Sequence, residues 1–259
     1  MFLPVDLHDL IVFEESSVLT VCCNPAVTAS IDENIVVKAA KAYATAFPHD
    51  VSTAKITVNK AIPTGGGLGG GSSDAASTLL GLALLNGKTI DQTSRSELQP
   101  IAETLGSDVP FFLDYSVAHV TGRGELIERV AGQAPWSILL ICPGIHVNTA
   151  HAYSTLGITC EQRHSNVVNA WHNAIVNNAF DTEALSNSFE GPVFAQHPVL
   201  ATCKQMLYEQ GALFASMSGS GSTIYGLFTD VDKAVDAQKS FVNMQSYICA
   251  SVSEEYRYV

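Results

Sequence analysis

Residues 63–76 read PTGGGLGGGSSDAA, and six of the seven residues at positions 65–71 are glycine. The strand-like segment AKITVNK precedes this stretch at residues 54–60, and an apolar segment that ends near Asn86-Gly87 follows it. Glycines allow backbone N–H groups to converge on a polyanion, and the N-terminus of the following helix adds a partial positive charge. The stretch therefore predicts a phosphate-binding loop that opens a helix, with a flexible surface connector as the alternative.

Two common phosphate-binding loops do not match this stretch. A Walker A loop requires a lysine directly before its Ser or Thr, and here a glycine precedes Ser72. The dinucleotide-binding motif G-x-G-x-x-G can be placed on this stretch only because it contains so many glycines. The sequence also shows no parallel strand followed by an acidic residue that could bind a ribose. The loop therefore belongs to another class of phosphate-binding protein.

The composition is that of a globular protein. Hydrophobic residues make up 47% of the 259 residues and charged residues 15%, which is enough apolar surface for one large domain or two lobes. The 25 acidic residues exceed the 13 Lys and Arg, and the resulting net charge of -12 repels a phosphate backbone. We therefore expect no nucleic-acid partner, and we expect any anionic ligand to be held locally by N–H groups and a few cations.

The sequence lacks the usual signals for membranes and metals. No apolar stretch is as long as a membrane-spanning helix, which needs about 20 residues. Asp6 and Asp9 lie where a signal peptide would have basic and apolar residues. We predict a cytoplasmic protein without a membrane partner. The six cysteines form no C-x-x-C pair and have no histidine at ligand spacing, so no protein metal site is predicted.

The order of predicted elements gives the fold class, which is α+β. The predicted strands cover residues 18–23, 54–60, 118–121, 126–130, 138–142, 213–216, 223–228 and a segment near 248. The predicted helices cover residues 34–46, 72–86, 94–105, 165–179, 199–210 and a segment from 231. The apolar run ILLIC at 138–142 suggests a new lobe, so we expect one lobe at residues 1–134 and a second at 135–259.

Residues 63–76 resemble the P-x-x-x-G-L-G-S-S-x-A-A motif of the galactokinase, homoserine kinase, mevalonate kinase and phosphomevalonate kinase superfamily. The extended form GGGLGGGSSDAA resembles one branch, the 4-diphosphocytidyl-2-C-methyl-D-erythritol kinases. Further similarities follow in the family's order, at residues 105–112 (LGSDVPFF), 122–125 (GRGE), 143–153 and 218–221 (SGSG). This resemblance implies an N-terminal lobe like ribosomal protein S5 and a ferredoxin-like C-terminal lobe.

The same resemblance implies an activity. It is the ATP-dependent phosphorylation of the 2-hydroxyl of 4-diphosphocytidyl-2-C-methyl-D-erythritol, in the non-mevalonate pathway to isoprenoid (terpenoid) precursors. The implied cofactors are ATP and Mg²⁺, the partner is this small-molecule substrate, and the protein is a monomer or a homodimer. Two alternatives stay open: a nucleotide-binding paralogue with impaired catalysis, and a kinase of the same superfamily that acts on homoserine or a mevalonate-type substrate.

The resemblance assigns roles to individual residues. Asp108 matches the catalytic aspartate and would accept the proton of the substrate hydroxyl, whereas the residues alone are equally compatible with a cap for the turn at Val109-Pro110. The implied nucleotide-binding residues are Asn34, Ile35, Lys60, Pro63, Gly65, Gly66, Gly67, Leu68, Gly69, Gly70, Gly71, Ser72 and Ser73. Helix capping by Asn34, Ser72 and Ser73, and a solvated lysine at the end of a strand, are the structural alternatives for this set.

The second lobe carries the implied substrate residues. Thr149 and Tyr153 match the cytosine pocket of the family, where an aromatic ring stacks on the base. A tyrosine packed in the core is the alternative, and a plain tight turn is the alternative for the SGSG segment at 218–221. Residues 187–190 read NSFE where the family has Asn-Asp-hydrophobic-Glu, and their role does not follow from the sequence.

Two motifs of the resembled family are not found ahead of residues 1–15. Members begin with A-K-x-N, which carries a reacting lysine, followed by D-G-[YF]-H, whose aromatic residue and histidine hold the cytosine. Catalytic groups that act as a unit lose most of their effect together. We therefore expect this chain to bind nucleotide with little turnover, and we expect Met1 to be an internal methionine of a longer reading frame.

Overall fold

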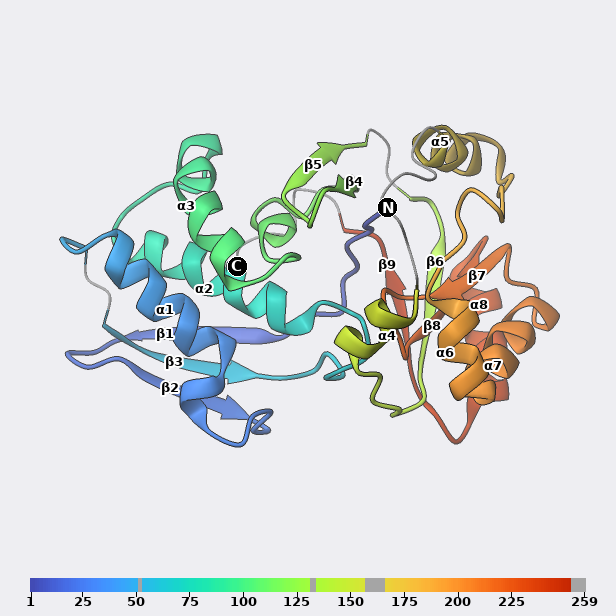
Figure 1. The fold of residues 1–259 in the computed structure, drawn as a ribbon, viewed down its shortest axis with the longest axis horizontal. Helices are drawn as coiled ribbons and strands as arrows, with labels where there is room; N and C mark the ends of the chain where they lie inside the picture. Colours follow the sequence, from blue (N-terminus) through green and yellow to red (C-terminus); the bar gives the residue numbers. More distant parts are fainter. Residues whose placement is uncertain (51–52, 131–133, 157–165, 253–259) are drawn as a thin grey trace. The chain divides into compact units, whose positions relative to one another are not determined.

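The structure, a computed structural model, describes residues 1–50, 53–130, 134–156 and 166–252 (Figure 1). Its contacts divide the chain into two compact units. The N-terminal unit consists of His8–Thr64 and Gly69–Arg129, and the C-terminal unit consists of Met1–Leu7, Gly65–Leu68 and the chain from Val130 onward. Both units combine helices and sheets, which confirms the predicted α+β class. The predicted lobe boundary between residues 134 and 135 stays a prediction.

A three-stranded sheet forms one layer of the N-terminal unit. Its strands are β1 (Leu10–Glu15), β3 (Ala54–Asn59) and β2 (Thr20–Asn24), in the order β1-β3-β2. The central strand β3 is antiparallel to β1 and parallel to β2. Strands β2 and β3 were predicted to within two residues at their N-terminal ends, whereas β1 was not, because its apolar run LIVF lacks an alternating pattern.

Three helices form the second layer of this unit and lie on the same side of the sheet in Figure 1: α1 (Ile35–Ala46), α2 (Gly70–Leu85) and α3 (Gln92–Leu105). Small side chains let α1 and α2 approach each other, since Ala39, Ala40, Ala75 and Ala76 are completely buried between them and the sheet. This packing fixes the first turn of α2, which follows the glycine-rich loop.

The remainder of the N-terminal unit follows α3. A turn leads into the short helix η2 (Pro110–Leu113), and a second short helix, η1 (Ile31–Glu33), precedes α1. The hairpin of β4 (Ala118–Thr121) and β5 (Leu126–Arg129) then forms as predicted, with Val120 paired to Ile127.

The C-terminal unit is built on an antiparallel sheet in the order β7-β8-β6-β9. These strands are β7 (Phe214–Met217), β8 (Ile224–Phe228), β6 (Ser137–Cys142) and β9 (Gln245–Ala250). Alternate residues point to opposite faces, as the period of a strand requires. Leu139 and Ile141 pack into the cluster formed with helices α6 to α8, and Trp136, just before β6, contacts Trp171 of α5.

The helices of this unit are α4 (Thr149–Thr155), α5 (Val167–Asn177), α6 (Glu190–Gln196), α7 (Pro198–Glu209) and α8 (Val231–Gln238), with the short helix η3 (Lys239–Phe241). Helices α5, α7 and α8 correspond to predicted segments, although the predicted start at Ser165 lies outside the described residues. Helix α6 was not predicted, because Gly191 and Pro192 lie in its first turn and are usually read as helix-breaking.

Candidate active site

The first part of the glycine-rich loop, Gly65–Leu68, is bound to a turn of the C-terminal unit. The backbone N–H of Thr223 donates to the carbonyl of Gly66 at 3.0 Å, and Ser218 Oγ donates to the carbonyl of Gly67 at 2.8 Å. A Cβ at Gly67 would lie 2.2 Å from the carbonyl oxygen of Ser218, and the φ of Gly67 is +76°. Only glycine fits here, so the SGSG segment holds this part of the loop.

Two side chains of the NSFE segment hold that turn in place. Asn187 Nδ2 donates to the carbonyls of Met217 and Gly219, at 2.7 and 2.8 Å. One carboxylate oxygen of Glu190 accepts the backbone N–H of Met217 at 2.9 Å and the hydroxyl of Ser216 at 2.8 Å, and the other accepts Lys204 Nζ at 2.6 Å. The role that the sequence left open is therefore to support the turn, through contacts between residues far apart in the chain.

The predicted substrate residues Thr149 and Tyr153 lie on α4 of the same unit. The hydroxyls of Thr149 and Ser220 are 3.0 Å apart, so this helix begins at the SGSG turn. Tyr153 is 64% exposed, and its ring meets Phe189 edge-on with the centroids 4.9 Å apart. The exposure of Tyr153 argues against the core alternative and leaves an aromatic surface free to stack on a base.

The second part of the loop opens α2 in the N-terminal unit. Gly69 is the N-cap residue of α2 with a φ of 70°, and no side chain caps this end of the helix. The hydroxyl of Ser73 donates to the carbonyl of Gly70 at 2.9 Å, and Ser72 is half-buried. Because the first N–H groups of a helix have no intrahelical partner, this end offers donors and a partial positive charge to an anion.

Asn34 and Ile35 lie where α1 begins. The side chain of Asn34 is buried and accepts the backbone N–H of Val36 at 2.9 Å, so it caps α1. Ile35 Cγ2 is 3.9 Å from the position of a Cβ on Gly71. The starts of α1 and α2 are therefore neighbours, and the structure brings both predicted residues beside the helix that follows the loop.

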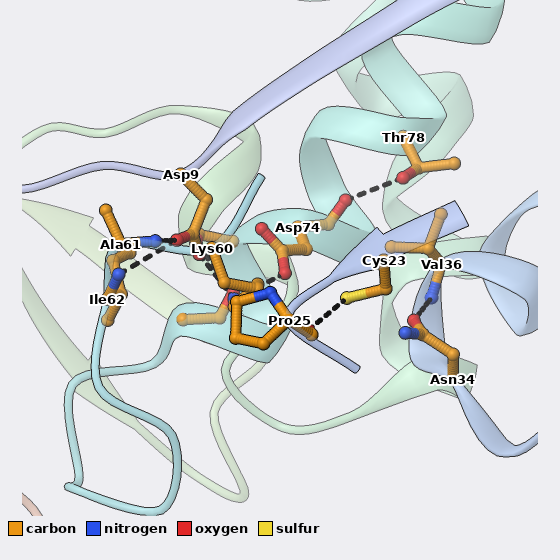
Figure 2. A network of polar contacts seen from close by, with 12 residues as sticks. Asp9, Cys23, Pro25, Asn34, Val36, Lys60, Ala61, Ile62, Asp74 and Thr78 are labelled. Carbon is orange, nitrogen blue, oxygen red and sulfur yellow. Dashed lines mark hydrogen bonds and ion pairs between the residues drawn. The ribbon is translucent and has the colours of Figure 1, made fainter. Parts of the chain in front are cut away.

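Lys60 is not solvated, in contrast to the structural alternative drawn from the sequence. Its ammonium is 2.7 Å from Asp74 Oδ2 and also forms an ion pair with Asp9 (Figure 2). The side chains of Lys60, Asp9 and Asp74 are only 5%, 2% and 7% exposed. Sequence analysis missed the two acidic partners, because Asp9 lies 51 residues before Lys60 and no local pattern connects them.

The electrostatics of this cluster follow from its burial. Burial raises the pKa of Asp74 to about 6, against the opposing effect of Lys60, and the charge of Asp9 adds to the rise. Burial alone would lower the pKa of Lys60, but its hydrogen bonds to Asp74 and Asp9 outweigh that effect and raise it. One ammonium thus serves two carboxylates.

Asp108 lies in the turn between α3 and η2. The residue is exposed, yet partial burial of its carboxyl raises its pKa above the ordinary value of an aspartate. The helix η2 has no side-chain capping hydrogen bond, which argues against the capping alternative. The GRGE turn packs against the residue before it, since a Cβ on Gly124 would lie 2.1 Å from the carbonyl oxygen of Ser107. A positioned carboxylate with a raised pKa can accept a proton.

Two family models match this chain and define its class. The model "GHMP kinases N terminal domain" matches residues 34–114, and the model "GHMP kinases C terminal" matches residues 165–243. The first range contains the glycine-rich loop and Asp108, and the second contains the NSFE segment and the SGSG turn. The fold and the residues described above therefore define a member of the GHMP kinases.

Curated relatives narrow this class to one family. A 4-diphosphocytidyl-2-C-methyl-D-erythritol kinase of Chlorobium phaeobacteroides (strain BS1) is 35% identical over 93% of this chain and 84% of its own length. The kinase of the same name from Prosthecochloris aestuarii (strain DSM 271 / SK 413) is 36% identical over 91% of this chain and 83% of its own length. The chain belongs to the family of 4-diphosphocytidyl-2-C-methyl-D-erythritol kinases, as its loop predicts.

Solved structures agree with this assignment. A crystal structure of 4-(cytidine 5'-diphospho)-2C-methyl-D-erythritol kinase matches with a TM-score of 0.79 and 29% identity, over 97% of this chain and 89% of that chain. A mevalonate kinase matches with a TM-score of 0.72 at 11% identity, over 97% of this chain and 92% of that chain, which shows a shared fold alone. Among the described residues, no helix is long and apolar enough to cross a membrane.

Proposed function

We propose that this chain transfers the γ-phosphoryl group of ATP to the 2-hydroxyl of 4-diphosphocytidyl-2-C-methyl-D-erythritol, a step in isoprenoid precursor synthesis. The observation that carries the proposal is the N-terminus of α2, which follows the glycine-rich loop and has no side-chain cap. The relatives of this chain are named as kinases of this substrate. Such a helix start binds phosphate through its N–H groups and its dipole. Asp108, with its raised pKa, supplies the proton acceptor that phosphoryl transfer to a hydroxyl needs.

In the proposed reaction the substrate's hydroxyl oxygen forms a bond to the γ-phosphorus as the bond to the β,γ-bridging oxygen breaks. The hydroxyl proton passes to the Asp108 carboxylate, and ADP leaves. The N–H groups of residues 69–72, at the start of α2, bind the phosphates, because an anion at a helix N-terminus is stabilised by unpaired donors. The remaining predicted nucleotide residues, Asn34, Ile35, Lys60 and Pro63, flank this segment in the sequence or the fold.

Mg²⁺ fits this arrangement as a metal held mainly by the nucleotide. Within the residues that the structure describes, no group of three His, Cys, Asp or Glu side chains could form a protein cage for a metal. The Ser73 hydroxyl donates a hydrogen bond to the carbonyl oxygen of Gly70, which leaves the lone pairs of Ser73 Oγ available to a metal beside the phosphates. Bound Mg²⁺ neutralises phosphate charge in phosphoryl transfer. We expect Ser72 and Ser73 to be its nearest protein ligands.

Thr149 and Tyr153 are proposed to bind the cytidine end of the substrate. The exposed ring of Tyr153 is fixed by its edge-on contact with Phe189, so it can stack on a base without losing further side-chain freedom. The Thr149 hydroxyl already pairs with Ser220 and can donate or accept toward a base edge. The cytoplasmic location and the monomeric or homodimeric state remain predictions.

The test is the turnover of the Asp108→Asn variant with ATP and 4-diphosphocytidyl-2-C-methyl-D-erythritol. We expect kcat to fall by about 10²–10⁴-fold, the range that a general base contributes, while the KM for ATP changes by no more than a few-fold. Glu103→Gln, an exposed carboxylate on α3, is the matched control and keeps its kcat.

Two results would contradict the proposal. Unchanged turnover of Asp108→Asn would remove Asp108 as the proton acceptor. Phosphorylation of homoserine or mevalonate in preference to the cytidine-containing substrate would assign the chain to another activity of the superfamily. ATP binding by the wild-type chain with no phosphorylation of any of the three would favour the nucleotide-binding paralogue.

A further inference from the structure

Asp9, Lys60 and Asp74 form a buried charged cluster, and its two carboxylates have no role in the proposed reaction. Figure 2 shows the two acidic side chains converging on the lysine from different segments of the N-terminal unit. Asp9 precedes β1, Lys60 follows β3, and Asp74 lies in the second turn of α2. Three charged side chains more than nine-tenths buried are uncommon unless each has a partner, as they do here.

The cluster joins the two ends of the glycine-rich segment. Lys60 directly precedes the segment that leads into the loop, and Asp74 follows the loop, so their 2.7 Å contact closes it at its base. Asp9 holds the entering strand end as well, because its Oδ1 accepts the backbone N–H of Ile62 at 2.9 Å and that of Ala61. Both carboxylates therefore act on the same short stretch of backbone.

The ammonium also lies at the start of α2. A Cβ on Gly70, the first residue of this helix, would be 3.5 Å from Lys60 Nζ. Lys60 Nζ donates hydrogen bonds to Asp9 and Asp74, and its positive charge compensates part of the negative charge of the two carboxylates. Without Lys60 at this point, two negative charges would lie directly behind the helix end that is expected to bind phosphate, and would oppose it.

We propose that Asp9 and Asp74 are positioning residues that hold the Lys60 ammonium beside Gly70, so that the start of α2 keeps the geometry and the potential needed for nucleotide phosphates. This inference rests on the proposed ATP-dependent function. A further titratable group near the cluster is Cys23 of β2, which interacts with Lys60 and Asp74. Burial raises the pKa of the Cys23 thiol, so it stays neutral near pH 7 and adds no charge to the cluster.

The experiment compares the ATP kinetics of Asp74→Ala and Asp74→Asn with wild type. Asp74→Ala removes one of the two partners that hold the ammonium beside Gly70. The KM for ATP should therefore rise by about ten-fold, the effect of losing one charge-assisted hydrogen bond, with kcat within about three-fold. Asp74→Asn keeps an acceptor for Lys60 and should stay within about three-fold of the wild-type KM. Thr78→Val is the matched control, since it removes the buried hydrogen bond from the Thr78 hydroxyl to the backbone carbonyl of Asp74 and leaves the cluster's charges in place.

The split between KM and kcat separates positioning from simple stability. A variant that only folded less completely would lose kcat in proportion to its folded fraction and would keep the wild-type KM for ATP. A displaced ammonium instead raises the KM for ATP of the folded molecules.

Two outcomes would overturn the inference: a KM for ATP of Asp74→Ala within two-fold of wild type, or an equal rise for Thr78→Val. They leave the proposed function intact, because the wild-type chain would still phosphorylate its substrate. A wild-type chain that neither binds ATP, measured by calorimetric titration, nor phosphorylates the substrate would instead refute the proposed function on which the inference rests.

Discussion

Each unit of this chain supports one part of the glycine-rich loop with a charged cluster, and the two clusters are built differently. In the N-terminal unit, one lysine serves two carboxylates, and all three side chains are at most 7% exposed. In the C-terminal unit, the carboxylate of Glu190 accepts a backbone N–H, a hydroxyl and the ammonium of Lys204, and the two charged side chains are 14% and 25% exposed. In the first cluster both carboxylates depend on the cation Lys60, whereas in the second cluster all three donors depend on the anion Glu190.

This difference determines which residue each cluster can lose. Removing the cation of the first cluster would leave two buried carboxylates side by side, and such uncompensated charges are strongly destabilising. Removing the cation of the second cluster leaves Glu190 with two neutral donors and access to water. The two clusters therefore predict three substitutions of decreasing effect.

Lys60→Met should have the largest effect. It should lower the free energy of unfolding by about 3–5 kcal/mol at pH 7, because Asp9 and Asp74 lose their common partner. The two tryptophans of the chain, Trp136 and Trp171, both belong to the C-terminal unit, so their fluorescence reports on that unit alone. Urea unfolding followed by far-UV circular dichroism should show the loss, with a smaller change in the fluorescence transition.

The pH dependence of this variant has a definite sign. Without Lys60 the pKa of Asp74 in the folded state rises further above the unfolded value, so the folded state binds more protons at mildly acidic pH. The stability of Lys60→Met relative to wild type should therefore recover as pH falls from 7 to 5. Lys55→Met, which breaks the exposed pair with Glu14, is the control and should show neither effect; equal losses would contradict the role of burial.

Glu190→Gln should have an intermediate effect. The variant keeps the shape of the side chain but replaces a charged acceptor of three donors by a neutral one, which should reduce stability by about 1–3 kcal/mol. The loss should be visible in tryptophan fluorescence, because Glu190 supports the β7 end and its turn in the C-terminal unit. Glu209→Gln, an exposed carboxylate on α7, is the matched control. A stability equal to wild type would show that Asn187 holds the turn without Glu190.

The local motifs were readable from the sequence, and the clusters were not. The loop at residues 63–76, the capped start of α1 at Asn34 and the hairpin of β4 and β5 depend on neighbouring residues, so spacing and turn chemistry predicted them. Family resemblance added Asp108 and Tyr153. Asp9 and Glu190 gain their roles only when β1 pairs with β3 and α6 meets β7, and such tertiary contacts leave no local pattern.

The same reasoning explains why the interpretation of Lys60 differs between sequence and structure. At the end of a predicted strand, a lysine is expected to extend into solvent. Here the start of α2 lies beside the end of β3, and the Asp74 carboxylate pairs with the ammonium while its backbone carbonyl accepts the hydroxyl of the completely buried Thr78 (Figure 2). Whether an end-of-strand lysine is solvated or enclosed thus depends on which element packs against it, and the sequence of the strand does not contain that information.

Lys204→Met should have the smallest effect, below about 1 kcal/mol, because a partly exposed ion pair contributes little once the carboxylate keeps other donors. The residue is 25% exposed, so water can replace the ammonium at Glu190, and the methionine retains the apolar stem of the lysine. Lys239→Met, which breaks an exposed pair with Asp236, provides the baseline for a surface lysine. The decisive measurement is a double-mutant cycle of Lys204→Met with Glu190→Gln, with unfolding followed by tryptophan fluorescence. A coupling energy between zero and about 1 kcal/mol would show that the second cluster depends on its anion. A coupling energy above about 3 kcal/mol would make this cluster equivalent to the buried cluster around Lys60 and would remove the contrast between the two units.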